Sequence, residues 1–386
     1  MKKLFTLAAA GSLAVASLSA QAQTVAVDGV LNATEVATGG YVLIGKYTNP
    51  RGFGDAGLLS LYAASTATKV YIFLGGTVEA NGNAFQVFMK TPASTGVPLG
   101  TALPAGTAGT SFEKLTAKMD MAVNMAVALR SDGTGFQIEG ATYTNATTAA
   151  SKKLTTTPIA GDGTAATLAT DAAYPALALA RVAYRNATGG KVSANPGSTT
   201  PTTGASYGGA GTYGLEMELD RTAMGLTGAA ALTLFALQNG GDGGYISSDF
   251  IPQTSAPLTT NSGNLAVGNY DFTALPDRQA ATLNLAAAGG TTLGTRAADA
   301  AAIALGVYPN PVRGASTVTY QVADRATNVN IVLTDLLGRT VRTIENGMKP
   351  VGTQTASVDA GALATGTYLM RVQVGDKVST SKVAVL

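Results

Sequence analysis

Apolar residues in the first 300 positions come in short runs separated by glycine- and asparagine-rich turns. Three of these runs are rich in β-branched and aromatic residues, which favour strands. They predict strands at 58–63, 69–74 and 84–89, with turns at Gly75-Gly76 and Asn81-Gly82-Asn83. Short strands joined by small-residue turns are typical of an all-β fold.

The segment 119–130 gives two conflicting signals. Its Met, Ala and Leu residues favour a helix, but its large apolar residues fall on the odd positions. A period of two is typical of a strand, so we predict a strand over 119–130. The glycine-containing turn at 131–135 should join it in a hairpin to a strand at 136–138.

Residues 145–212 are rich in Ala, Thr, Gly and Ser, with scattered prolines. This composition predicts long loops around a few short strands. Apolar and polar positions alternate again at 214–220 and 231–238. A glycine-rich loop at 239–245 then leads into a further strand at 247–252.

Residues 306–386 show the clearest alternation of apolar and polar positions. Pro309 and Pro311 fix an extended backbone and remove two donors, so a central strand can begin only after them. The alternation predicts a small Ig-like sandwich of about seven strands. Residues that share an apolar strand face are Val318, Tyr320, Val322, Val329, Ile331, Leu333, Tyr368, Met370, Val372 and Val374.

Several motifs in this segment agree in order and spacing with one family. The segment opens with Tyr308-Pro309-Asn310-Pro311 and ends with Lys382-Val383-Ala384-Val385. Over residues 306–386 it resembles the type A C-terminal sorting domain of the type IX secretion system of Bacteroidetes. The positions that match the family motifs are Tyr308, Pro309, Asn310, Pro311, Gly338, Gly366, Tyr368 and Lys382.

The resemblance implies a route and a set of partners. It implies that the Sec translocon exports the chain to the periplasm. The type IX machinery would then carry it across the outer membrane. In the family, the domain is usually cleaved near the linker, and the passenger is released or attached to an anionic lipopolysaccharide. The implied location is therefore outside the cell or on its outer surface.

The N-terminus agrees with export. Lys2 and Lys3 precede an apolar run from Leu4 to Leu18, and Ala20-Gln21-Ala22 follows it. This pattern predicts a signal peptide cleaved after Ala22, and the alternative is a membrane anchor or a buried helix. The predicted parts are a signal peptide at 1–22, a β-sandwich passenger at 23–284, a linker at 285–305 and the sorting domain at 306–386.

Charge and composition exclude several partners. Two of the 25 basic residues lie in the predicted signal peptide. The mature chain would therefore have 25 − 2 = 23 basic and 23 acidic residues, and its net charge would be close to zero. A net charge near zero argues against a basic surface for nucleic acid or anionic lipid. After the signal peptide, no segment is long and apolar enough to predict a transmembrane span.

The absence of two residue types restricts the chemistry. The chain has no His and no Cys, which excludes Ser-His-Asp and Cys-His triads, His or thiolate zinc sites, disulfides and lipoprotein anchoring. Paired carboxylates acting on sugars, a Ser-Lys nucleophile and an oxygen-ligated Ca²⁺ remain open, as does the absence of catalysis.

The passenger resembles the jelly-roll sandwiches of family 9 carbohydrate-binding modules and DOMON-like domains. The likeness lies in Val27-Asp28-Gly29, in residues 214–219 followed by Met224-Gly225-Leu226, and in residues 232–252. This resemblance implies a polysaccharide ligand. One departure is that the chain has no Trp, the residue from which the family usually builds its sugar-stacking platform.

Three groups of residues are candidates for a site. Glu216 and Glu218 lie at i and i+2 on one strand face, where they could act as a carboxylate pair or as a solvated polar face. Asn239, Asp242 and Asp249 could bind Ca²⁺, or they could belong to a plain glycine turn. The aromatic residues that would line a glycan groove, or else pack in the core, are Tyr41, Tyr47, Phe53, Tyr62, Tyr245 and Phe250.

These observations favour a non-catalytic, glycan-binding or adhesive protein exported by the type IX system. One alternative is a glycan-active enzyme that uses Glu216 or Glu218 together with Asp242 or Asp249. A third reading, from the Ala-, Gly- and Thr-rich composition, is a structural surface or matrix protein that assembles with itself.

Overall fold

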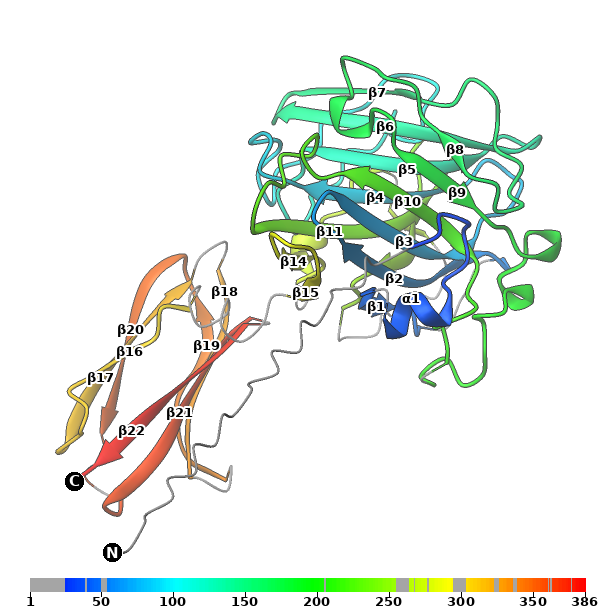
Figure 1. The fold of residues 1–386 in the computed structure, drawn as a ribbon. Helices are drawn as coiled ribbons and strands as arrows, with labels where there is room; N and C mark the ends of the chain where they lie inside the picture. Colours follow the sequence, from blue (N-terminus) through cyan, green and yellow to red (C-terminus); the bar gives the residue numbers. More distant parts are fainter. Residues whose placement is uncertain are drawn as a thin grey trace, which may run out of the picture.

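The computed structural model describes residues 25–38, 40–49, 54–204, 206–254, 264–266, 268–275, 278–293, 303–322, 326–335, 339–359, 361, 363–375 and 377–386. The predicted signal peptide, Phe53, Gly338 and residues 294–302 of the predicted linker lie outside these ranges. The described chain is almost entirely antiparallel β-structure, which confirms the predicted all-β fold class (Figure 1).

The first sheet of the passenger has six strands in the order β1-β2-β3-β10-β9-β8. Its strands are β1 (Val42–Lys46), β2 (Gly57–Ser65), β3 (Lys69–Thr77), β8 (Ala166–Thr167), β9 (Arg181–Tyr184) and β10 (Gly214–Asp220). The predicted strands at 58–63, 69–74 and 214–220 are confirmed.

The second sheet runs in the order β13-β12-β11-β4-β5-β6-β7, and β14 and β15 extend it from β11. Its strands are β4 (Ala84–Lys90), β5 (Met125–Ser131), β6 (Phe136–Asn145), β7 (Thr148–Lys153), β11 (Ala230–Asn239), β12 (Ile246–Ile251), β13 (Asn264–Ala266), β14 (Ala281–Leu285) and β15 (Thr291–Leu293). The hairpin between β5 and β6 across 131–135 is present as predicted.

The two sheets form a sandwich because alternate residues of each strand face the same core. Ile72 and Leu215 of the first sheet belong to one buried cluster with Val87, Val127 and Leu234 of the second. Alternation of this kind places one face of a strand inside and the other outside. Glu216 and Glu218 are therefore on the outer face of β10, since Leu215, Met217 and Leu219 occupy the inner one.

Both outer faces are also covered. Residues 25–41, with the short helix α1 (Ala33–Ala37), pack on the first sheet around Tyr62 and Phe73. Residues 97–123 pack on the second sheet around Phe88 and Phe235.

This second cover corrects the strand predicted at 119–130, because only 125–130 lie in β5. Met119, Met121 and Val123 do point inward on alternate positions, but they belong to the covering segment, which makes isolated bridges such as Val97 with Val123. Inward-facing side chains therefore do recur at every second position. Residues 119–124, however, belong to no strand.

The region 145–212 contains short elements joined by loops, as predicted. Besides β7, β8 and β9 it holds the 3₁₀ turns η1 (Pro175–Leu177), η2 (Thr188–Gly190) and η3 (Val192–Ala194), and a fourth, η4 (Phe272–Ala274), lies between β13 and β14. Asn195 ties these loops together. Its buried amide donates to the carbonyl of Tyr213 (3.0 Å) and accepts from the amide of Gly197 (3.1 Å).

The C-terminal unit is a separate sandwich with its own core. One sheet has the order β16-β17-β20 and the other β19-β18-β21-β22. Its strands are β16 (Gly306–Tyr308), β17 (Ala315–Val322), β18 (Thr327–Thr334), β19 (Thr340–Lys349), β20 (Gly352–Asp359), β21 (Gly366–Val374) and β22 (Lys377–Val385). This agrees with the predicted Ig-like sandwich, and the residues predicted to face inward are buried except Tyr368, which is half-buried.

The passenger sheet continues beyond the predicted start of the linker. Leu283 and Leu285 of β14 are buried, and β14 pairs with β15 across Gly289 and Gly290. Both glycines have positive φ (98° and 96°), which the turn requires and other residues rarely adopt. The sheet therefore reaches Leu293, and Ile303 already belongs to the C-terminal core.

Candidate functional site

Glu216 is a buried carboxylate that holds the N-terminal segment on the first sheet. Its Oε2 accepts from the amides of Asp28 (3.0 Å) and Gly29 (3.1 Å), and its Oε1 accepts from the Tyr41 hydroxyl (2.7 Å). The side chain is completely shielded from solvent. Burial raises the pKa of Glu216 to about 8, because desolvation of the charged form outweighs these three hydrogen bonds.

A second carboxylate holds the same segment from within. Glu35 lies on α1, and its two oxygens accept from the amides of Ala26 (2.8 Å) and Asn32 (2.9 Å). Burial also raises the pKa of Glu35. We call residues 25–41 the N-terminal strap, since Glu35 and Glu216 together fix both its start and its end.

Glu218 lies on the same face of β10 but in a more open place. Arg181 of β9 forms an ion pair with it at 3.5 Å, and the Arg181 side chain is 43% exposed. The neighbouring Tyr71 has its pKa raised to about 12 by burial and by the Glu218 charge. Both glutamates therefore share a face, as predicted. Glu216 binds the N-terminal strap, whereas Glu218 pairs with Arg181.

The residues predicted to bind Ca²⁺ have separate partners. Asp242 forms an ion pair with Lys114 at 2.5 Å, and its other oxygen accepts from the amide of Gly244. Asp249 accepts from the amide of Leu58 (3.0 Å), and the Asn239 amide donates to the carbonyl of Ser111 (3.1 Å). No group of three or more acidic residues that could hold a metal ion is found in the described ranges.

Four of the predicted groove aromatics are buried. Tyr41 and Tyr62 pack edge to face at 6.4 Å under the strap, Tyr47 lies in the sandwich core, and Phe250 contacts Phe235 and Phe272 beneath the cover of the second sheet. Burial favours the core interpretation for these four rings. Tyr245, which is 55% exposed, is the aromatic residue of the set whose ring reaches the surface. Phe53 lies outside the described residues.

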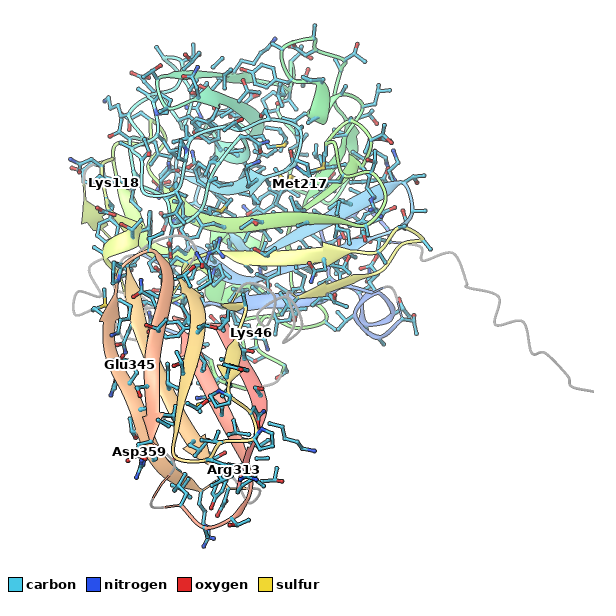
Figure 2. The ribbon with its side chains drawn as sticks, turned by 90° about the vertical axis from the view of Figure 1, so that its left-hand side faces the viewer. Lys46, Lys118, Met217, Arg313, Glu345 and Asp359 are labelled. Carbon is cyan, nitrogen blue, oxygen red and sulfur yellow. The ribbon has the colours of Figure 1, made fainter. Side chains whose placement is uncertain are left out.

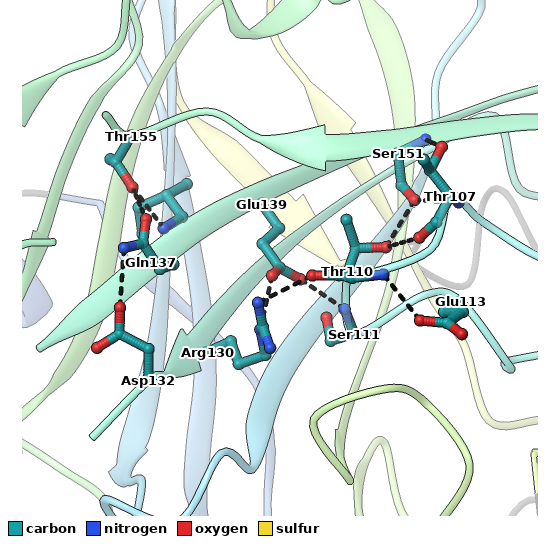
Figure 3. A network of polar contacts seen from close by, with 12 residues as sticks. Thr107, Thr110, Ser111, Glu113, Arg130, Asp132, Gln137, Glu139, Ser151 and Thr155 are labelled. Carbon is teal, nitrogen blue, oxygen red and sulfur yellow. Dashed lines mark hydrogen bonds and ion pairs between the residues drawn. The ribbon is translucent and has the colours of Figure 1, made fainter. Parts of the chain in front are cut away.

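Polar side chains of the second sheet fasten its cover, and Ser111 takes part in several of these hydrogen bonds. The Ser111 amide donates to Glu139 of β6 (2.7 Å), and the Ser111 carbonyl accepts from Gln86 of β4 (2.9 Å) and Asn239 of β11. Arg130 of β5 forms an ion pair with Glu139 at 2.7 Å and also donates to the carbonyl of Gly109 (Figure 3). Four neighbouring strands, β11, β4, β5 and β6, and the turn at 109–111 are thereby joined in one network.

Arg221 is a buried cation whose partners are backbone carbonyls. Its guanidinium donates to Leu226 (3.0 Å), Thr66 (2.8 Å), Ala286 (2.8 Å) and Gly228. It follows β10 directly and joins the turns after β2, β10 and β14. Arg221, Glu35 and Glu139 belong to no motif in the sequence, so their roles appear only from their tertiary contacts.

In the C-terminal sandwich, the first and last motifs are in contact. The Asn310 amide donates to the carbonyl of Lys382 (2.7 Å), and its Oδ1 accepts from the amide of Ala384 (3.0 Å). Next to it, the Val312 amide donates to the carbonyl of Ala384 (2.7 Å). We call these contacts the motif clamp, since they close the 309–312 segment onto the last strand.

The other described motif positions also have defined places. Gly366 begins β21, and the Tyr368 hydroxyl donates to the carbonyl of Ala364 at 2.9 Å. Tyr308, Pro309, Pro311 and Lys382 are exposed. Gly338 lies outside the described residues.

Comparison with known proteins identifies the C-terminal unit. Residues 306–386 match the family of secretion system C-terminal sorting domains. The match covers the second sandwich and confirms the type IX sorting domain expected from the motifs. The chain is therefore that of a secreted or cell-surface protein that engages the type IX machinery.

Comparison of the chain with solved structures finds a weak similarity. A similar solved structure is the dimeric latent PorU from Porphyromonas gingivalis, with 12% identity, a TM-score of 0.20, and coverage of 83% of this chain and 32% of PorU. This chain thus spans about a third of the length of that protein. No curated protein matches the sequence. Among the described residues, no helix is long and apolar enough to cross a membrane.

Proposed function

We propose that this protein is a type IX secretion passenger whose 25–293 sandwich acts outside the cell as a non-catalytic, glycan-binding or adhesive module. The observation that carries the proposal is the coincidence of the sorting-domain match, 306–386, with a sandwich that has its own core. A transport domain that packs separately leaves the passenger as the part that works after export.

The surroundings of the candidate carboxylates support a role without catalysis. Glu216 has no exposed surface, and its oxygens accept from the N-terminal strap. Asp249 is buried beside the amide of Leu58, and Asp242 is paired with Lys114. A pair of glycosidase carboxylates must flank the sugar bond across an open cleft, so these engaged groups favour binding over hydrolysis.

The surface around Tyr245 supports a binding role. Tyr245 follows the glycine-rich loop at 240–244. Asp242 of this loop and its ion-pair partner Lys114 are also partly exposed. The face of an exposed tyrosine ring packs against the apolar face of a sugar, and neighbouring polar groups bond to its hydroxyls. We infer that a glycan would contact this loop.

Export is tested by deleting residues 306–386 in a bacterium that has a type IX system. Cell fractions are probed with an antibody against the passenger. The truncated protein is expected in the periplasm and the full chain in the medium or on the cell surface. Equal amounts of both proteins outside intact cells would contradict the proposal.

Binding is tested with the purified chain from residue 23, a panel of polysaccharides, and a reducing-sugar assay on the same samples. Binding without sugar release supports the proposal. Tyr245→Ala should weaken the binding of polysaccharide. Leu179→Ala, which alters an exposed apolar residue elsewhere, should leave that binding unchanged. Sugar release would indicate an enzyme. Self-assembly with no binding to any glycan would indicate a structural surface protein.

A further inference from the structure

The sequence contains three Asn-Gly pairs, at 81–82, 239–240 and 346–347, and the fold places them in different surroundings. In such a pair the glycine has no side chain to shield the backbone amide that follows the asparagine. The asparagine side chain can then cyclise onto this amide and lose its own nitrogen. Two of the pairs are protected from this reaction by the structure, and the third is not.

Asn239-Gly240 is protected by burial. The Asn239 side chain is buried, and its amide donates to the carbonyl of Ser111 at 3.1 Å. The Gly240 amide donates to the carbonyl of Tyr245 at 2.8 Å, so its nitrogen is already engaged. Cyclisation at this pair would break both hydrogen bonds inside a closely packed region.

Asn346-Gly347 is protected by strand pairing. It lies inside β19 next to Glu345, which Figure 2 places on the C-terminal sandwich. Asn330 and Val329 of β18 face the two residues across the ladder and keep them extended. In an extended strand the side chain stands perpendicular to the chain, away from the amide that follows it, so the strand must open before cyclisation.

Asn81-Gly82 lies in the turn between β3 and β4 and has neither kind of protection. Asn81 is exposed, and a Cβ added to Gly82 would meet no atom closer than 4.0 Å. The Gly82 amide forms no hydrogen bond with a described residue. The Asn81 Oδ1 accepts from the amide of Asn83 at 3.1 Å, which folds the side chain back over the Gly82 peptide. This Asx turn directs the Cγ of Asn81 toward the free Gly82 nitrogen.

We propose that Asn81 is a site of spontaneous deamidation in the folded protein. Hydroxide removes the Gly82 amide proton, and the nitrogen attacks Cγ of Asn81. The bond from Cγ to Nδ2 breaks, and Nδ2 takes a proton from water and leaves as ammonia, so that a succinimide ring remains. A water molecule then opens either of the two C–N bonds of the ring, which gives aspartate or isoaspartate at position 81.

The product alters the neighbouring glycine-rich loop at 240–244. The Asn81 Nδ2 donates to Glu79 Oε2 at 2.5 Å, so deamidation replaces a hydrogen bond by two carboxylates that repel each other. The turn also packs on the loop, because a Cβ on Gly241 would clash with the Gly82 carbonyl oxygen. Isoaspartate adds a methylene group to the main chain at this contact. The loop therefore becomes more mobile as the protein ages.

The test is peptide mapping by mass spectrometry of the purified full-length chain after incubation at mildly alkaline pH. Water enriched in heavy oxygen labels the asparagines that react during the incubation. Asn81 should convert about tenfold or more faster than Asn239 and Asn346, which must open first. In concentrated urea the three rates should become similar. Conversion of Asn81 no faster than that of the other two in the folded protein would overturn the inference.

A matched variant tests the effect on the loop. Asn81→Gln keeps an amide group, but its longer side chain forms a less favourable ring with the Gly82 nitrogen, so position 81 should stay unconverted. Hydrogen exchange is then measured on the parent and on this variant after the same incubation. The amides of 240–244 should exchange faster in the parent, and those of β10 should exchange alike in both.

The effect on the loop is contradicted if the amides of 240–244 exchange alike in the two proteins, or if those of β10 change equally. None of these readouts uses a glycan. Failure of the proposed function, seen as the absence of polysaccharide binding, would therefore be distinguished from failure of this inference.

Discussion

The Asn310 side chain pairs with Ala384 as a neighbouring strand would, accepting from its amide at 3.0 Å while donating to the carbonyl of Lys382 at 2.7 Å. One amide side chain thus replaces a rung of backbone pairing at the edge of β22. Asn is suited to this role, because its carboxamide has the donor and acceptor geometry of a peptide group.

Replacing Asn310 by Ala should destabilise the C-terminal sandwich by about 1–2 kcal/mol, since two hydrogen bonds to backbone groups are lost. Urea unfolding of the full-length protein, followed by far-ultraviolet circular dichroism, measures this change. Asn328→Ala is a matched control, because Asn328 is exposed at the opposite end of the same sheet and should tolerate the change. Equal effects of both substitutions would argue against the motif clamp as a source of stability.

The stability of the passenger should depend on the protonation of Glu216. Its pKa is raised from 4.5 to about 8 in the folded protein, so the folded chain holds a proton that the unfolded chain has released. The resulting stabilisation is complete below about pH 4.5 and is lost as the pH rises to about 8. We expect the free energy of unfolding to fall by about 2–4 kcal/mol between pH 5 and 8.

Glu216→Gln should flatten this pH dependence. A glutamine can still accept from the amides of Asp28 and Gly29 with its oxygen, and it can donate to the Tyr41 hydroxyl with its nitrogen. Glu218→Gln, on the same strand face, leaves Glu216 in place and should keep the slope. An unchanged slope in Glu216→Gln, measured by urea unfolding at several pH values, would remove Glu216 as its origin.

Arg221→Lys should destabilise the passenger by about 3 kcal/mol, because a single ammonium group cannot reach four carbonyls that surround a planar guanidinium. Thermal unfolding of the purified chain measures the loss. The control is Arg181→Lys, which alters a partly exposed ion pair and should cost less than about 1 kcal/mol. A small effect at Arg221 would mean that the turns after β2, β10 and β14 hold together without it.

Glu139→Ala should loosen the cover of the second sheet. The substitution leaves the Ser111 amide and Arg130 without their buried partner, which should cost about 2 kcal/mol or more. Hydrogen exchange at the Ser111 amide should become faster. The change at Glu113→Gln should be much smaller, since Glu113 accepts from the exposed amide of Gly109 and is itself partly exposed. Unaltered protection of Ser111 would contradict the role of Glu139.

Period and turn chemistry were enough to predict most strands. Val318 and Ile331 each lie between polar neighbours. In both strands the apolar positions of this alternation are the buried ones. The segment at Met119 shows where such reasoning stops. A covering segment that packs over a sheet also places every second side chain inward, and only the partner strand distinguishes the two cases.

The candidate sites were harder to predict, because single residues take their roles from tertiary contacts. Sequence spacing placed Glu216 and Glu218 on one face, but it could not show that Gly29 and Tyr41 would bury the first of them. A charged residue among apolar strand positions, such as Glu139, was the available signal for a buried network. The resemblance of the tail gave its motif positions, whereas the exposure of Tyr308 required the structure.

The motif clamp has a consequence for synthesis of the protein. Asn310 finds its partners only when residues 382–384 have been made, although more than seventy residues of the chain separate them. A ribosome that stops before Lys382 produces a passenger whose sorting sandwich cannot close around its own opening motif. The motif clamp can therefore form only after translation has passed Ala384.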